Sequence, residues 1–212
     1  TVLTQALTDG DQVLEIGPGR IATERMVPDH LFGAARYTAI DIRRLQHHAA
    51  LVAPDRFVAA DVCRMPFADQ SFDVIACNNV LPFVSDYRPA LQELHRCLKR
   101  SGVLLVTTHC VSGQPTCSTA EDRASPRARS DAWYAENATD WVFGDDLREI
   151  MRGVGLELCC HDLFGCEPTE NLLRLGLKSP STMMLAFRDV EAASRFGIGS
   201  CWRPRPLSVD DV

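Results

Sequence analysis

Val13-Leu14-Glu15-Ile16-Gly17-Pro18-Gly19 is the stretch that decides the fold this sequence predicts. An apolar run ends in an acid and two glycines, which indicates a buried strand leading into a tight turn. Gly17 and Gly19 lack a Cβ, so they can adopt positive φ and let a ligand approach the backbone. The residues that follow, 21–26, are expected to begin a helix. Strand, glycine turn and helix together are typical of sites for nucleotide-like ligands.

Beyond this turn, apolar runs alternate with segments of helical periodicity. Helices are predicted at 43–51, 87–99 and 145–154, with Ser101-Gly102 ending the second of them. This alternation indicates parallel strand pairing with right-handed crossovers. The predicted fold class is therefore α/β, a Rossmann-like three-layer sandwich. Further strands are predicted at 37–42, 57–61, 71–77, 103–107, 156–160 and 182–187.

The chain, 1–212, is predicted to form a single domain with four parts. Residues 11–108 are the ligand-binding core, and 143–188 complete the sheet. Between them, 109–142 break the alternation with Pro115, Pro126 and several Ser and Thr. Such a long excursion inside a compact domain is commonly a functional lid. The remainder, 189–212, is expected to be an irregular tail.

The composition excludes several function classes. With 46% hydrophobic and 24% charged residues, the sequence is typical of a globular domain. A net charge of −6 argues against binding to nucleic-acid backbones. No apolar run approaches the roughly 20 residues of a membrane span, and no signal-like segment opens the chain. We therefore expect a cytoplasmic protein without a nucleic-acid or membrane partner.

The nine cysteines do not predict a metal site, because none form a Cys-x-x-Cys pair. Cys159-Cys160-His161 with Cys166 is the one cluster that resembles metal ligands. Adjacent residues of a strand point to opposite faces, so one ion could not use them all. We expect structural thiols, with Cys77, Cys159 and Cys160 packed as small hydrophobic residues.

Polar residues end three of the predicted strands, at the edge where open α/β sheets bind ligands. Asp41 ends the second strand, where a carboxylate can accept two hydrogen bonds from a ribose diol. Asp61 and Val62 end the third and suit an aminopurine, because the acid can accept from the exocyclic amine while the valine packs on the ring. Asn78 ends the fourth strand.

From residue 12 to 108 the sequence resembles class I S-adenosylmethionine (SAM)-dependent methyltransferases. The segment 15–19 is similar to their first motif, and 61–67 with 71–75 are similar to their adenine loop and fourth strand. The resemblance implies SAM as cofactor, S-adenosylhomocysteine as product, and a seven-stranded, mostly parallel sheet whose antiparallel strand is 182–187. The residues implied or expected to hold SAM are Glu15, Gly17, Pro18, Gly19, Asp41, Ile42, Asp61, Val62 and Asn78.

The latter half of the chain is similar to bacterial members acting on small molecules or on glycan and polyketide intermediates, so a small-molecule acceptor is expected. His109, after the fifth strand, is the candidate general base. The aromatic residues Trp133, Tyr134, Trp141 and Phe143 could form acceptor walls, or could anchor the lid to the core.

Three features depart from the family pattern. Ile21 replaces the third glycine, Pro82-Phe83 stand where many relatives have an acid and a histidine, and about ten residues precede the first strand. These departures keep open a catalytically silent regulatory or partner subunit. A nicotinamide-dependent oxidoreductase is a further alternative, although no Tyr-x-x-x-Lys pattern for hydride transfer is present.

Overall fold

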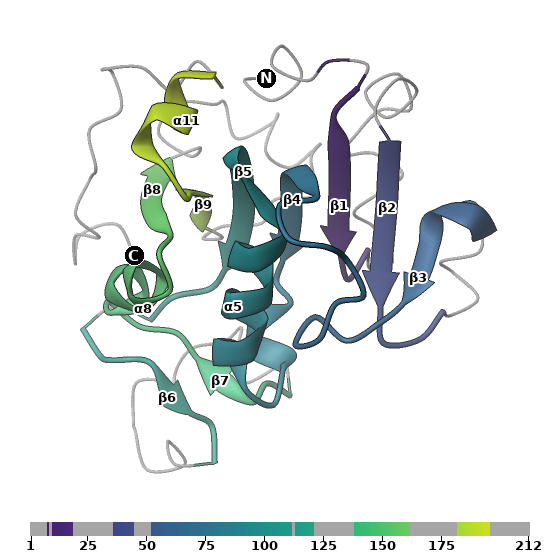
Figure 1. Ribbon diagram of the computed structural model, residues 1–212. Helices are drawn as coiled ribbons and strands as arrows, with labels where there is room; N and C mark the ends of the chain where they lie inside the picture. The colour runs from purple at the N-terminus through teal and green to yellow at the C-terminus, as the bar shows by residue number, and fades with distance from the viewer. Residues whose placement is uncertain are drawn as a thin grey trace, which may run out of the picture.

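The computed structural model describes residues 8, 10–18, 36–44, 52–111, 113–120, 138–161 and 182–195. Within these ranges, one sheet has the order β3-β2-β1-β4-β5-β9-β8 (Figure 1). Strands β1 to β5 pair in parallel, and β9 is antiparallel to both neighbours. The predicted α/β sandwich with an antiparallel last strand is confirmed. The strands are β1 Gln12–Ile16, β2 Arg36–Asp41, β3 Phe57–Ala59, β4 Phe72–Asn78, β5 Leu98–Thr108, β8 Glu157–His161 and β9 Thr182–Phe187.

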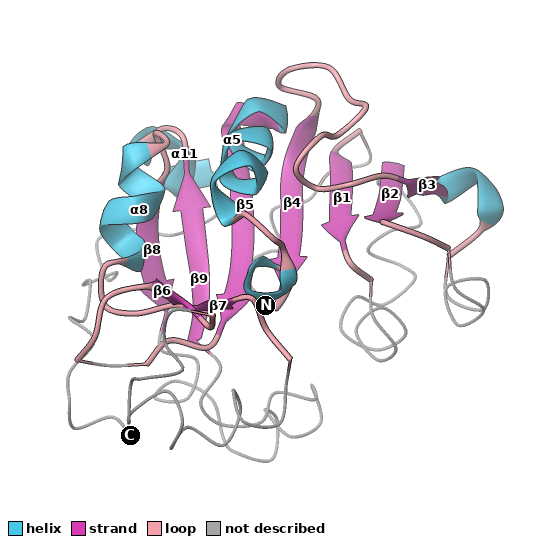
Figure 2. Ribbon diagram, turned by 90° about the horizontal axis from the view of Figure 1, so that it is seen from below, coloured by secondary structure: helices cyan, strands magenta, loops and turns pink. Residues whose placement is uncertain are grey.

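Two hydrophobic layers cover the two faces of the sheet. Helices α5 (Tyr87–Cys97) and α8 (Leu147–Gly153) lie on one face, where Leu104 and Val106 of β5 are buried (Figure 2). Val103 and Leu105 point to the other face, where they pack with α11 (Val190–Arg195). This division follows from the two-residue period of a strand. Because both faces are covered, the central strands are apolar almost throughout.

The junction between α5 and β5 differs from the expected one. The helix ends at Cys97, and Leu98 is already extended and paired with Phe72, so β5 begins five residues earlier than predicted. The pairing register shifts between Phe72 and Val74. A Cβ on Gly102 would lie 2.8 Å from the carbonyl oxygen of Asp73. Gly102 thus permits close strand contact at an irregularity rather than ending the helix.

The expected irregular tail is also wrong in part, because residues 190–195 form α11. Its last residue, Arg195, donates to Asp11 at 2.6 Å and to Asp73 at 3.2 Å. Lys99 donates to the other oxygen of Asp73 at 2.7 Å. These contacts join α11 to the starts of β1, β4 and β5. The residues beyond 195 lie outside the described part of the chain.

The predicted lid has an ordered base in the residues that the structure describes. Strands β6 (Cys117–Ser118) and β7 (Trp141–Val142) pair antiparallel. Trp133 and Tyr134 lie outside the described residues, as do the predicted helix 21–26 and most of 43–51. Two 3₁₀ helices, η1 (Pro54–Arg56) and η2 (Leu81–Phe83), complete the elements. None of the described helices is long and apolar enough to cross a membrane.

Candidate functional site at the carboxyl edge of the sheet

The carboxyl ends of the parallel strands meet at one edge, and the order of the strands along the sheet reverses between β1 and β4. In Figure 1, β1 and β2 point toward this edge, and the β6–β7 ribbon lies beyond it. Strand register places Ile16 opposite both Ile40 and Cys77, and Asn78 opposite Thr107. The residues immediately after β1, β2, β4 and β5 are therefore level with one another. This is the place where open α/β sheets bind their ligands.

Gly17 makes the first turn at this edge. Its φ is +61°, and its amide donates to the carbonyl of Ile40 at 2.8 Å. A Cβ at this position would lie 2.7 Å from Cγ2 of Val80, which follows β4. Only glycine meets both requirements without strain. Pro18 is buried beside it, and Gly19 lies outside the described residues.

Glu15 is the buried acid of the site. Its side chain is 6% exposed, and Oε2 accepts a hydrogen bond from the hydroxyl of Tyr37 on β2. Burial raises the pKa of the Glu15 carboxyl to about 7, although the bond from Tyr37 lowers it. Burial and the adjacent Glu15 raise the pKa of Tyr37 well above its ordinary value. Tyr37 therefore keeps its proton at neutral pH and donates this hydrogen bond to Glu15.

Asp41 and Ile42 lie at the same edge, at the end of β2. Asp41 is half-buried and is level with Ala59 of β3. Ile42 comes directly after the strand with 78% of its surface exposed, whereas the preceding Ile40 is fully buried. An exposed large apolar side chain next to a carboxylate offers both contacts that a nucleoside requires, one for the flat base and one for the ribose hydroxyls.

The loop after β3 presents Asp61 and buries Val62. Asp61 is exposed, and its Oδ1 accepts from the amide of Cys63 at 2.8 Å. Val62 differs from expectation, because its side chain is 6% exposed and belongs to the hydrophobic layer beneath α5. The side chain of Val62 therefore packs in the core and not, as had been expected, against a purine ring. Among the described residues beside β2 and β3, Ile42 is a large apolar side chain that remains exposed.

Asn78 and His109 end β4 and β5. The Oδ1 atom of Asn78 accepts from the hydroxyl of Thr107 at 3.4 Å, which fixes the amide against the neighbouring strand. Asn79 turns the chain with φ +52°, a conformation that Asn tolerates better than most residues. His109 is 8% exposed, one residue beyond β5. The structure therefore brings the predicted base to the same edge as Asn78.

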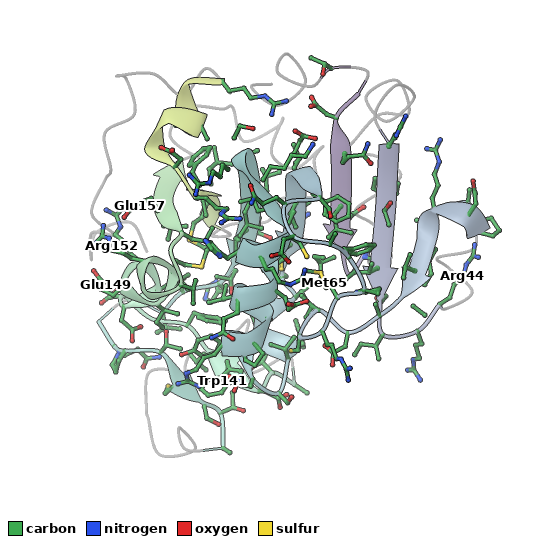
Figure 3. All side chains as sticks on the ribbon, in the orientation of Figure 1. Arg44, Met65, Trp141, Glu149, Arg152 and Glu157 are labelled. Atoms are coloured by element: carbon green, nitrogen blue, oxygen red, sulfur yellow. The ribbon has the colours of Figure 1, made fainter. Side chains whose placement is uncertain are left out.

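The two described aromatic residues of the lid anchor it to the core. Phe143 is fully buried, and its ring lies 5.3 Å from that of Tyr87 on α5. Trp141 lies edge to face with Tyr87 at 4.8 Å, and its indole donates to the carbonyl of Ser85 at 3.2 Å (Figure 3). These contacts are the ones expected if Trp141 and Phe143 anchor the lid to the core. Phe83 of η2 is 45% exposed and was not predicted as a site residue.

Tyr37 was also missed by the sequence reasoning. Its hydroxyl is a polar group in the predicted strand 37–42, and that was the available signal. Of the three cysteines expected to pack as small hydrophobic residues, Cys77 is fully buried in the core. Among the residues placed by the structure, no group of three metal-ligating side chains occurs.

The sheet order, with its antiparallel β9, is that of the class I SAM-dependent methyltransferase fold. In agreement, residues 14–106 match the family model described as a methyltransferase domain. These residues of the chain form a class I SAM-dependent methyltransferase domain, and the cofactor of that class is SAM. This match decides between the two cofactor classes that a glycine turn alone leaves open.

Similar proteins carry methyltransferase names. A malonyl-[acyl-carrier protein] O-methyltransferase of Salmonella typhimurium is 29% identical over 129 residues, 58% of this chain and 48% of that protein. A demethylmenaquinone methyltransferase of Corynebacterium urealyticum is 24% identical over 164 residues, covering 71% and 70%. The crystal structure of Burkholderia thailandensis 1,6-didemethyltoxoflavin-N1-methyltransferase has a TM-score of 0.56 at 19% identity, covering 84% and 70%. The chain thus spans about half the length of the Salmonella relative.

Proposed function

We propose that this chain binds SAM at the edge between β1 and β4 and transfers its methyl group to a small organic acceptor. The observation that carries the proposal is Glu15, a carboxyl group buried at the glycine turn. Burial of a carboxylate is unfavourable, so a buried acid with a pKa of about 7 in such a position favours a ligand-binding role.

The residues at this edge fit SAM. Glu15, held by Tyr37, can accept from the ammonium group of the methionine moiety, directly or through water. Asp41 can accept from the ribose diol, and Asp61 can accept from the exocyclic amine of adenine. Exposed Ile42 can pack against the purine ring. Gly17 and Asn78 line the turns between which the methionine moiety would lie.

The chemistry requires alignment more than acid–base catalysis. SAM supplies an electrophilic methyl group on a sulfonium, and an acceptor must reach that methyl in line. The protein contributes by orienting both partners and excluding water. For a hydroxyl or amine acceptor, His109 at the end of β5 can take the proton released on methylation. This role is supported by its position at the same edge as Asn78.

A small acceptor is favoured by two observations. The relatives described above are named for methylation of malonyl-[acyl-carrier protein], demethylmenaquinone and 1,6-didemethyltoxoflavin. In addition, the chain has a net charge of −6, which disfavours a nucleic-acid acceptor. The exposed ring of Phe83, one turn beyond β4, offers apolar surface for such a molecule.

The test is a screen of small organic acceptors with SAM, with S-adenosylhomocysteine formation as the readout. We expect turnover with at least one class of acceptor, and we expect His109→Asn to lower kcat more than it changes the dissociation constant for SAM. Binding of SAM without turnover of any acceptor would favour the catalytically silent subunit. Absence of SAM binding would reject the proposal.

A further inference from the structure

Residues 61–71, in the connection between β3 and β4, form a loop that is attached to the C-terminal half of α5. After a tight turn in which Arg64 donates its amide to the carbonyl of Asp61, the loop leaves the sheet edge. It does not return to the sheet until Phe72 begins β4. The first residue of this loop, Asp61, is the one proposed above to read the adenine amine.

Glu93 holds the start of the loop. Its Oε2 accepts from the amide of Met65 at 2.7 Å, and the side chain of Met65 lies beside α5 (Figure 3). Glu93 is itself held by Arg96, whose Nε donates to Oε1 at 2.7 Å and whose Nη2 donates to Oε2 at 2.8 Å. This two-point contact fixes the guanidinium plane.

Arg96 holds the rest of the loop. Its Nη1 donates to the carbonyl of Phe67 at 2.7 Å and to Asp69 at 2.8 Å, and Nη2 donates to the carbonyl of Met65 at 3.2 Å. The backbone continues the attachment, because the amide of Gln70 donates to the carbonyl of Arg96 at 2.8 Å. One side chain therefore binds three residues of the loop.

These contacts differ from those of an ordinary surface ion pair, which contributes little to stability. Glu93 and Arg96 are 19% and 30% exposed, and five of the donor–acceptor distances of their side chains are 2.8 Å or shorter. The hydrogen bonds from Arg96 lower the pKa of Glu93. The pair thus remains ionised, and three of its four side-chain hydrogen bonds to other residues end on loop backbone. The Glu93–Arg96 pair therefore fixes the backbone path of the loop.

We infer that Glu93 and Arg96 are positioning residues for purine recognition, which set the place of Asp61 through the backbone of residues 65–70. This inference rests on the proposed SAM site and deepens it. A guanidinium is needed because lysine cannot bridge a carboxylate and three loop acceptors at once. The pair acts on the adenine end of the ligand and leaves the contacts at Glu15 unchanged.

The test compares binding of S-adenosylhomocysteine with binding of S-inosylhomocysteine, which lacks the adenine amine, by calorimetry. We expect wild type to prefer the adenine ligand by about tenfold, the effect of one hydrogen bond to a charged group. Arg96→Lys and Arg96→Ala should reduce this preference toward one. When either Arg96 substitution is combined with Asp61→Ala, the preference for the adenine ligand should be no lower than in Asp61→Ala alone. Thermal unfolding identifies the temperature range in which each variant is folded. If Arg96→Ala does not fold, the ligand preference is measured in Arg96→Lys alone.

Arg152→Ala is the matched control. Arg152 also pairs with a glutamate, Glu157, at 3.2 Å, but both lie at the margin of the molecule away from Met65 (Figure 3). This variant should retain the full adenine preference. An unchanged preference in folded Arg96 variants, or an equal loss of affinity for both ligands, would overturn the inference and leave the SAM site intact. If wild type binds neither ligand, the proposed function itself fails.

Discussion

Glu15 shows, at the scale of single residues, that a side chain proposed to bind the ligand also lowers the free energy of unfolding. A buried carboxyl whose pKa is raised from 4.5 to about 7 disfavours folding when it must ionise. The unfolded chain releases this proton near pH 4.5 and the folded chain near pH 7. Between these values the folded state binds more protons, so Glu15 lowers the free energy of unfolding as pH rises.

Glu15→Gln should therefore stabilise the protein while weakening SAM binding. Above pH 7 we expect the variant to exceed wild type in unfolding free energy by up to about 3 kcal/mol, from 1.36 kcal/mol per pKa unit. Below pH 4.5 the two should agree. Urea unfolding at pH 4 and pH 8 measures the difference. A difference independent of pH would show that Glu15 does not titrate in this range.

Gly17→Ala should impair the turn itself. The positive φ costs a non-glycine residue about 1–2 kcal/mol, and the new Cβ would collide with Val80. We expect lower SAM affinity by calorimetry together with lower stability. Gly153→Ala is the control, because nothing lies within 4 Å of its added Cβ. If both variants bind SAM as wild type does, the turn is not part of the binding site.

At the scale of elements, the sequence predicts buried strands well and their boundaries less well. The run around Phe72 was recognisable because a central strand is apolar on both faces. The start of β5 was missed because Lys99 and Arg100 give it a polar beginning at an irregular pairing. Among the proposed site residues, the positions of Asp41 and Asp61 at the carboxyl edge were predictable because parallel strands end at one edge.

Other parts of the site depend on contacts that no local pattern specifies. Tyr37 donates a hydrogen bond to Glu15, 22 residues away in the sequence, and Arg96 donates one to Met65, 31 residues away. Whether Val62 faces a ligand or the core is also decided by tertiary packing, since either face of the loop could be buried. Such contacts can be found only once the fold brings the segments together.

The β6–β7 ribbon makes the lid a removable element. Ser118 pairs with Trp141, and the amide of Thr119 donates to the carbonyl of Asp140 at 3.0 Å, so the described parts of the chain before and after residues 121–137 lie side by side. Replacing them with a linker of about four residues, a common hairpin length, should preserve the ribbon. We expect retained SAM binding and loss of turnover with the acceptor found by screening. Turnover by this variant would place acceptor recognition outside the lid.

At the scale of the whole molecule, Arg195 connects the last described helix to the first strand, 184 residues apart along the chain. Its partners Asp11 and Asp73 are both 5% exposed. Their burial means that they cannot recover full hydration if Arg195 is removed.

Arg195→Ala should lower the unfolding free energy by about 1–3 kcal/mol, since it leaves buried carboxylates with fewer donors. Lys99 remains on Asp73 and limits the loss. Thermal unfolding measures the effect, and Arg152→Ala, which breaks an exposed pair, should change little. An unaltered melting temperature in Arg195→Ala would mean that α11 does not fasten the sheet.

The most direct test of the proposed cofactor site is calorimetric titration of wild type and Asp41→Ala with SAM and with NAD. We predict that wild type binds SAM and not NAD. Asp41→Ala should lose about 1–3 kcal/mol of SAM binding, because the ribose hydroxyls lose their acceptor. Binding of NAD without measurable SAM affinity would contradict the account. Unchanged SAM affinity in the variant would show that the ribose is held by another acid.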